Sequence, residues 1–211
     1  MNPLRKTVTF LLGLYFDLHI EGRENIPEGE GVVIASNHRG YADPVFNTMP
    51  MKKRVRYMAK EELFKNPLFA RFITSLGAFP VRRGAGDMAL INDCAEMVKS
   101  GQNLVIYPEG TRSKTGKLGR LKTGVVIIAS KANADILPMG INYEGEKLRF
   151  RTKVTLRVGK VIPASEVHAE EGDRKSINAA KQRILSALKE VVDEPVDTEI
   201  PENGASDSSD V

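Results

Sequence analysis

A histidine and an aspartate five positions apart, His38 and Asp43, are the pair of residues in this sequence best suited to acid–base chemistry. A carboxylate bonded to one imidazole nitrogen fixes the tautomer and leaves the other nitrogen available to accept a proton. On a continuous helix the two side chains would point roughly 140° apart, so the pair needs a turn between them. Gly40 and a helix start at Asp43-Pro44 supply that turn. The spacing therefore predicts a positioned general base.

The same spacing also fits a structural pair, in which Asp43 only caps a helix and His38 bonds to the backbone. The remaining candidates for chemistry are weaker. Ser36 lacks the glycine-flanked turn of a serine nucleophile, and three widely spread histidines give poor metal-ligand spacing. Cys94, the single cysteine, falls in a helical stretch and is expected to be buried and inert. We therefore expect no metal site, and a base that activates a substrate hydroxyl directly.

A second group of residues follows the apolar segment 104–107, in the run Tyr-Pro-Glu-Gly-Thr-Arg-Ser that ends at residue 113. It contains a carboxylate, Glu109, a glycine that permits close backbone approach, Gly110, and Arg112, whose guanidinium suits bidentate phosphate binding. The alternative is a surface loop with an incidental ion pair. The cations between residues 114 and 122 are expected to be solvated and to face a membrane or a carrier.

The elements that must position these residues alternate between strand-like and helix-like segments. Strands are expected at 16–21, 32–35, 55–58, 78–81, 104–107, 136–141 and 148–158, and helices at 45–49, 61–76, 88–99, 125–133 and 174–192. The 61–76 helix is expected to be open to interruption at Asn66-Pro67. Repeated βα units predict an α/β fold, a single domain with a mainly parallel twisted sheet flanked by helices on both faces.

This architecture makes a geometric prediction about the candidate site residues. In such sheets the working groups gather beyond the carboxyl ends of the strands. Loops that leave four predicted strands carry His38, Lys60, Arg83, and Glu109 with Arg112. Residues spread over about seventy positions are therefore expected to converge on one edge of the sheet.

The charge of the chain is divided unequally. Of its 211 residues, 31 are basic and 27 acidic, but seven of the acidic residues and no basic ones lie in 193–211. That segment is predicted to be a disordered acidic tail. The remainder has 31 basic and 20 acidic residues, a formal charge of +11, which favours an anionic partner. Nucleic acid is disfavoured, because the chain has no tryptophan, 6% aromatic residues and no recognisable binding motif.

The N-terminal segment 1–16 contains an uncharged run of ten residues, 7–16, about half of what crossing a bilayer requires. It lacks a small-residue cleavage site, which disfavours a signal peptide. It is either a helix packed on the domain 17–192, or a short helix in the membrane interface. In the second case we expect a peripheral or monotopic protein of the cytoplasmic face of the cell membrane. The residues expected to face lipid are Leu4, Phe10, Leu11, Leu14 and Tyr15, beside Arg5 and Lys6.

Four motifs, taken in order, resemble the glycerolipid acyltransferase superfamily, and most closely its bacterial 1-acyl-sn-glycerol-3-phosphate acyltransferases. They are Asn37-His38-x4-Asp43, the segment 77–83, Glu109-Gly110-Thr111-Arg112, and the segment 136–138. The resemblance covers about residues 15 to 160 and includes the 21–27 and 60–63 segments. One His-x4-Asp is weak support, whereas four motifs in order are specific.

The resemblance implies a role for each matching residue. His38 is the general base and Asp43 its orienting partner. Cations hold the phosphate of the acceptor, and Glu109 with Gly110 positions its glycerol. The implied phosphate ligands are Lys60, Arg83 and Arg112. Thr111 is counted among the substrate-binding residues, and Pro138 shapes the acyl-binding region. Many relatives have an acidic residue in place of Arg82, which leaves open which arginine of the Arg82-Arg83 pair contacts phosphate.

The implied reaction transfers a fatty acyl group from acyl-CoA or acyl carrier protein to the sn-2 hydroxyl of 1-acylglycerol-3-phosphate, giving phosphatidic acid for phospholipid biosynthesis. No cofactor is expected beyond the thioester co-substrate, and the expected partners are the two substrates and an anionic membrane surface. Two alternatives stay open: another lysolipid as acceptor, such as a lyso-ornithine lipid, and a non-catalytic lipid-surface binding protein with this fold.

Overall fold

A computed structural model describes residues 3–29, 31–81, 88–113, 115–143 and 147–193. Seven strands form one sheet, with the order β1-β7-β6-β2-β5-β3-β4. The strands are β1 (Asp17–Glu21), β2 (Val33–Ser36), β3 (Val55–Lys60), β4 (Ala78–Val81), β5 (Asn103–Ile106), β6 (Ile136–Tyr143) and β7 (Lys153–Val158). The helices are α1 (Pro3–Tyr15), α2 (Asp43–Thr48), α3 (Pro67–Ser75), α4 (Met88–Lys99), α5 (Gly124–Ala132), α6 (Ala164–Val167) and α7 (Arg174–Val191), with short 3-10 turns at Arg23–Asn25 and Glu61–Phe64.

Five strands, β2 to β6, run parallel, which confirms the mainly parallel sheet. The sheet reverses at one edge, because β7 pairs antiparallel to β6 and β1 pairs parallel to β7. Only nine residues separate β6 from β7, fewer than the dozen or so that a crossover to a parallel neighbour needs. The two edge strands therefore run against the other five.

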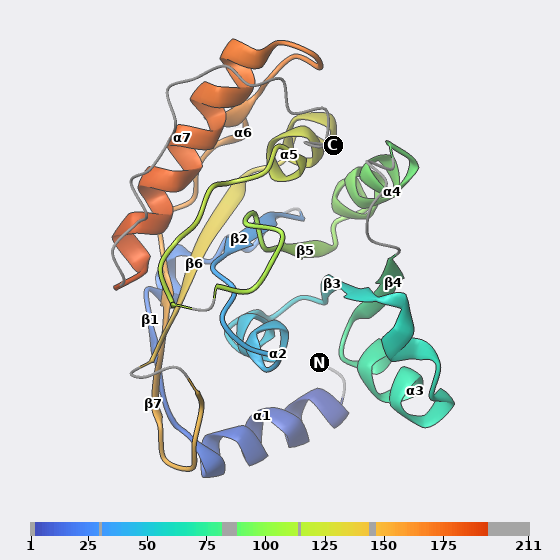
Figure 1. Cartoon of the computed structure of the whole chain (residues 1–211), viewed down its shortest axis with the longest axis vertical. Helices are drawn as coiled ribbons and strands as arrows, with labels where there is room; N and C mark the ends of the chain where they lie inside the picture. Colours follow the sequence, from blue (N-terminus) through green and yellow to red (C-terminus); the bar gives the residue numbers. More distant parts are fainter. Residues whose placement is uncertain (1–2, 30, 82–87, 114, 144–146, 194–211) are drawn as a thin grey trace.

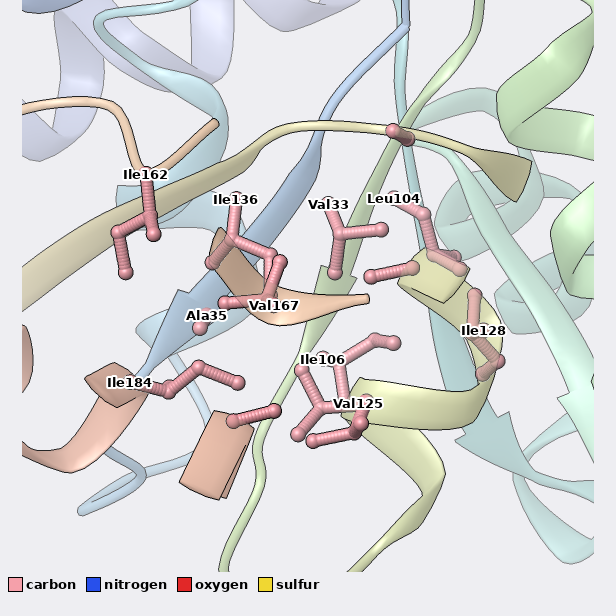
Figure 2. Close-up of a cluster of buried hydrophobic side chains, with 14 of the residues drawn as sticks. Val33, Ala35, Leu104, Ile106, Val125, Ile128, Ile136, Ile162, Val167 and Ile184 are labelled. Atoms are coloured by element: carbon pink, nitrogen blue, oxygen red, sulfur yellow. The ribbon is translucent and has the colours of Figure 1, made fainter. Parts of the chain in front are cut away.

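The central strand β2 is buried on both faces, and its alternate residues point to two different cores. Val33 and Ala35 pack with side chains of α4, α5, α6 and α7, whereas Ile34 packs with residues of β3, α3 and β6. Figure 2 shows part of the first core, where Val33, Ala35 and Leu104 lie among side chains from α5 and α7. A continuous apolar run such as 32–35 suits this position, because neither face of the strand meets water.

The helices form two layers around the sheet, as Figure 1 shows: α4, α5 and α7 lie toward one end of the view, and α1, α2 and α3 toward the other. Under α1 and α2 a separate small core contains Phe16 and Phe46, whose rings meet edge to face at 5.7 Å. Helix α2 is therefore held in place by this small core, and so is its first residue, Asp43.

Most expected elements form where the sequence predicted them, and two differ. The 61–76 helix is divided at the expected Asn66-Pro67 position, where the Asn66 side chain caps α3 by accepting from Leu68 N and Phe69 N. Strand β7 begins at Lys153 rather than at residue 148, and α6 was not predicted, since four residues give no helical period. The acidic segment 194–211 lies outside the described residues.

Helix α1 packs on the domain through one cation. Arg5 is buried, and its guanidinium donates to the backbone carbonyl oxygens of Met51 and Lys53. Burial lowers the pKa of Arg5. Arg5, expected beside the lipid-facing residues in the interface alternative, is bound by backbone carbonyl groups of the domain instead. Within the described parts of the chain, no helix is both long enough and apolar enough to cross a membrane.

The side of α1 that faces away from Arg5 and the domain is exposed and apolar. Phe10 is 66% exposed and Leu14 58% exposed, and Leu11 and Tyr15 lie beside them. The Tyr15 ring also meets the exposed ring of Phe150, at 5.3 Å between centroids, so the apolar surface extends onto the segment before β7. We call these five residues the α1 apolar surface.

Candidate active site

The chain leaves β2 at the carboxyl edge of the sheet, and Asn37 controls its path. The Asn37 side chain donates to Ile141 O at 3.0 Å and accepts from Ile141 N at 2.8 Å. The Asn37 side-chain amide thus makes the hydrogen bonds to β6 that the backbone of a continuing strand would make. The backbone is released from the strand at this point, and the next residue is His38.

The His38 and Asp43 side chains meet. His38 Nδ1 lies 2.8 Å from Asp43 Oδ2. Because a carboxylate can only accept, Nδ1 carries the hydrogen, and Nε2 keeps its lone pair. The Asp43 side chain is fully buried and that of His38 is 14% exposed, so the imidazole stands between the buried carboxylate and the surface. This geometry is that of a general base with an orienting partner.

Asp43 is not the N-cap that its position before Pro44 suggested. Ala42 is the N-cap, without a side-chain bond, and Asp43 is the first residue of α2. The Asp43 carboxylate turns back instead, and Oδ2 also accepts from Arg39 N at 2.6 Å and Gly40 N at 2.7 Å. The turn at 39–40 thus folds around the carboxylate. Among the described residues, the other oxygen, Oδ1, is buried without a hydrogen-bond partner.

The loop after β5 docks on the His38 loop through hydrogen bonds to the backbone of His38. His38 N donates to Glu109 Oε1 at 3.3 Å, and Ser113 N donates to His38 O at 2.7 Å. The second carboxylate oxygen of Glu109 accepts from Gly119 N at 3.0 Å. Burial raises the pKa of Glu109, while these hydrogen bonds oppose the rise. Glu109 therefore joins the loops at 38, 109 and 119, and contact with a glycerol stays a prediction.

An aromatic ring covers the imidazole. Tyr107, the residue after β5, stacks on His38 with 4.0 Å between ring centroids and 16° between planes. Its hydroxyl oxygen accepts from Asn47 Nδ2 at 3.2 Å. The sequence placed Tyr107 in the 107–113 run but gave it no role, because only the pairing of β2 with β5 brings the two rings together.

Arg112 lies in the same docked loop and contacts the His38 loop through Tyr41. Its Cζ lies 4.0 Å from the centre of the Tyr41 ring, and Nη2 is 3.2 Å from the Tyr41 hydroxyl. Tyr41 is 80% exposed. Arg112 is thus held at the surface, in a loop that contacts the His38 loop. Thr111 is exposed next to Arg112. Gly110 has a φ of +74°, a backbone conformation that residues other than glycine rarely adopt.

Arg39 stabilises the outer side of the His38 loop and was not singled out in the sequence. Its guanidinium lies over the Tyr143 ring, 3.9 Å from the centroid, and donates to Tyr143 O at 2.7 Å. Gly116 passes so close to the guanidinium that a Cβ there would lie 2.9 Å from Arg39 Nη2. Contacts of this kind give no pattern along the sequence, since Tyr143 and Gly116 are far from Arg39 in the chain.

The other predicted site residues are not joined to His38 and Asp43 by any contact described above. Lys60 ends β3 at the same edge of the sheet and is exposed, two strands away from β2. No hydrogen bond or ion pair among the described residues joins it to the His38 cluster. Arg82 and Arg83 lie outside the described residues. Pro138 is buried in β6, in register with Ala35. In the described parts of the chain, no group of His, Cys, Asp and Glu side chains is arranged to hold a metal ion.

Cys94 is buried in the core between α4 and the sheet, as the sequence predicted. Burial, with the nearby charge of Asp93, raises the pKa of its thiol to about 11. A thiol with that pKa is almost wholly protonated near neutral pH, so Cys94 is no nucleophile.

Comparison with known proteins agrees with this geometry. The family model described as "Acyltransferase" matches residues 17–142, which include strands β1 to β5, most of β6 and both docked loops. A 1-acyl-sn-glycerol-3-phosphate acyltransferase of Bacillus subtilis is 28% identical over 86% of this chain and 91% of its own length. The chloroplastic 1-acyl-sn-glycerol-3-phosphate acyltransferase LPAT1 of Arabidopsis thaliana is 26% identical over 82% of this chain. The chain spans about half the length of that plant relative and of a similar one from Brassica napus.

A solved structure shares the fold. The crystal structure of the 1-acyl-sn-glycerophosphate (LPA) acyltransferase of Thermotoga maritima matches with a TM-score of 0.66 and 26% identity. The match covers 87% of this chain and 77% of the other. The fold class and the family expected from the four motifs are confirmed. With a family match over more than half of its residues, and with His38 and Asp43 in contact at the expected edge of the sheet, this chain belongs to the acyltransferase family.

Proposed function

We propose that this protein transfers a fatty acyl group from a thioester, acyl-CoA or acyl carrier protein, to the sn-2 hydroxyl of 1-acylglycerol-3-phosphate. The product is phosphatidic acid, a precursor of membrane phospholipids. The observation that carries the proposal is the hydrogen bond of 2.8 Å between His38 Nδ1 and the buried Asp43 carboxylate, in a member of the acyltransferase family. Relatives named for this reaction in bacteria and plants support the choice of substrate.

The chemistry follows from the free imidazole nitrogen. His38 Nε2 accepts the proton of the acceptor hydroxyl while that oxygen attacks the thioester carbonyl carbon. A carbon–oxygen bond forms and the carbon–sulfur bond breaks; the departing sulfur then takes the proton from His38. Asp43 stabilises the imidazolium in between. The two substrates together supply all the atoms of the reaction, and the proposed step uses neither a protein nucleophile nor a metal.

The acceptor carries a phosphate, and Arg112 is the described cation best placed to bind it. It is exposed, lies in the loop docked on His38, and is fixed on the Tyr41 ring. A guanidinium binds phosphate through two parallel hydrogen bonds, which an ammonium cannot reproduce. Lys60, and Arg82 or Arg83, are the further phosphate ligands implied by the family motifs.

We expect Arg112→Ala to raise the KM for 1-acylglycerol-3-phosphate about tenfold or more, since a charge-assisted contact contributes roughly 1.5–3 kcal/mol. Arg112→Lys should recover only part of this affinity. Steady-state kinetics with the acceptor varied at saturating donor measure the effect. The KM for the thioester donor is the internal control and should change less than about threefold. An unchanged acceptor KM in a folded variant would remove Arg112 from the phosphate site.

A donor-by-acceptor activity matrix tests the proposal itself. Acyl-CoA and acyl carrier protein thioesters are each combined with 1-acylglycerol-3-phosphate, another lysophospholipid and a lyso-ornithine lipid, and the released thiol is measured. The proposed function predicts release with the first acceptor and formation of phosphatidic acid. Release only with another acceptor would change the substrate, and no release with any pair would favour a lipid-binding protein without activity.

The α1 apolar surface is proposed to contact the membrane that holds both lipid substrates. Exposed aromatic and aliphatic side chains on one side of a short helix suit insertion among lipid headgroups, and the basic body suits anionic lipids. On this basis the protein is peripheral or monotopic on the cytoplasmic face. Arg5 contributes by fixing the helix to the domain rather than by touching lipid.

We expect the double variant Phe10→Asp with Leu14→Asp to reduce binding to vesicles of anionic phospholipid at least about tenfold, because each charge opposes insertion of an apolar side chain. Sedimentation with vesicles measures bound protein. The control adds the same two charges to exposed positions of α7, Asn178→Asp with Ala179→Asp. Equal loss in both variants would mean that net charge matters and that the α1 apolar surface does not.

A further inference from the structure

The aromatic ring over His38 is placed to do more than fill space. The Tyr107 and His38 rings are nearly parallel, 16° apart, with 4.0 Å between centroids. We propose that Tyr107 is a positioning residue for the acyl transfer, whose ring fixes the plane of the His38 imidazole so that Nε2 points at the acceptor hydroxyl. This inference rests on the proposed role of His38 as the base.

The contact with Asp43 cannot fix the imidazole by itself. That hydrogen bond holds one atom, Nδ1, and it tolerates a range of angles, so small rotations about the side-chain bonds of His38 remain open. Such a rotation would move Nε2 sideways without breaking the hydrogen bond. A flat ring against one imidazole face blocks the motion. Displacements of about 1 Å in reacting groups can cost about a hundredfold in rate.

Tyr107 is itself anchored at both ends. Its backbone continues from β5, which pairs with β2, the strand that leads to His38. Its hydroxyl oxygen accepts from Asn47 Nδ2, and Asn47 Oδ1 accepts from the Ser36 hydroxyl at 3.2 Å. Asn47 and Ser36 are fully buried. The bonds thus lead from the ring back to the end of β2, and the ring cannot slide off the imidazole without breaking them.

The ring is also suited to the charged state of the base. Burial raises the pKa of the Tyr107 hydroxyl well above its usual range, and the charge of Asp43 adds to the rise. The ring therefore stays a neutral phenol. The face of a neutral aromatic ring attracts a cation, so it favours the imidazolium that forms when His38 takes the proton.

The simplest alternative is that Tyr107 only completes the core, since it packs against the cluster formed by residues of β2, β3 and β6. The two roles make different kinetic predictions. Loss of packing lowers stability, and its effect on the rate does not depend on His38. Loss of positioning lowers kcat with little change in KM, and it matters only while His38 is present.

The experiment compares Tyr107→Phe, which keeps the ring face, with Tyr107→Leu, which removes it. We expect kcat of the Phe variant to stay within about threefold of the wild type, and kcat of the Leu variant to fall about ten- to a hundredfold. The KM for each substrate should change less than about threefold in both. Thermal unfolding identifies folded protein; if the Leu variant does not fold, Tyr107→Met takes its place, because an unbranched side chain adapts to the same space.

The same substitution is repeated in a His38→Ala background. There Tyr107→Leu should cause no further loss in rate, because the group that it positions is missing. Three results overturn the inference: full kcat in the Leu variant, equal losses in the Phe and Leu variants, or an equal factor of loss with and without His38. An active His38→Ala enzyme would instead refute the proposed base, so the two failures are distinct.

Discussion

His38→Ala is expected to reduce the rate of acyl transfer at least about a hundredfold, with little change in the KM for either substrate. A positioned base contributes about 10²–10⁴-fold, and no other imidazole or carboxylate among the described residues contacts His38 except Asp43 and, at its backbone, Glu109. The measurement is thiol release from acyl-CoA in the presence of 1-acylglycerol-3-phosphate. Native Cys94 adds little background to such an assay, because it is buried and protonated.

A matched control exists in the same chain. His19 also pairs with an aspartate, with 3.0 Å between Nε2 and Asp17 Oδ1, but both side chains are about half exposed on the edge strand β1. His19→Ala removes an equivalent imidazole–carboxylate pair from the surface and should leave the rate within about twofold, since exposed pairs contribute little. A folded His38→Ala protein with the full rate would refute the assignment of the base.

Asp43→Asn is expected to produce the second-largest loss, about a hundredfold in kcat, in a protein that still folds. An asparagine oxygen can accept from Arg39 N and Gly40 N as the carboxylate does. The amide is neutral, however, and no longer stabilises the imidazolium that forms during transfer. One oxygen of Asp43, Oδ2, serves His38 Nδ1, Arg39 N and Gly40 N, so the asparagine oxygen takes that place and the lost charge accounts for the effect.

Asp43→Ala separates catalysis from folding. It should lose a similar factor in kcat and also lower the free energy of unfolding by about 2–4 kcal/mol, because two backbone N–H groups lose their acceptor. Denaturant titration measures the second effect, and Asp17→Asn is the control for a removed surface carboxylate. If Asp43→Asn kept the full rate, the carboxylate would only hold the turn, and the structural alternative for this pair would be correct.

Local sequence was sufficient to predict most of the elements. The strands of the parallel region, such as β2 and β5, are short apolar runs, and a run buried on both faces is recognisable from composition alone. The order of βα units then places the residues after each strand at one edge of the sheet, whichever strands are neighbours. For this reason His38 and Arg112 could be assigned to one site from their positions in the chain.

Two local features were misread because a tertiary contact competes with the local one. Asp43 before Pro44 has the pattern of a helix cap, yet its carboxylate turns back to His38 and to the turn at 39–40. Arg5 was grouped with the residues expected to face lipid, yet it binds the carbonyl oxygens of Met51 and Lys53. In both cases the better acceptor or donor lies outside the window of residues that determines local preference.

The sequence by itself determined the family motifs, the parallel βα order and the pairing of His38 with Asp43, since these depend on residues within one or two segments. Only the tertiary structure decided that Tyr107 covers the imidazole and that Glu109 holds the backbone of His38, a residue 71 positions away. The reason is physical: these contacts arise from the lateral neighbours of β2 in the sheet, and strand order leaves no periodic signal along the chain.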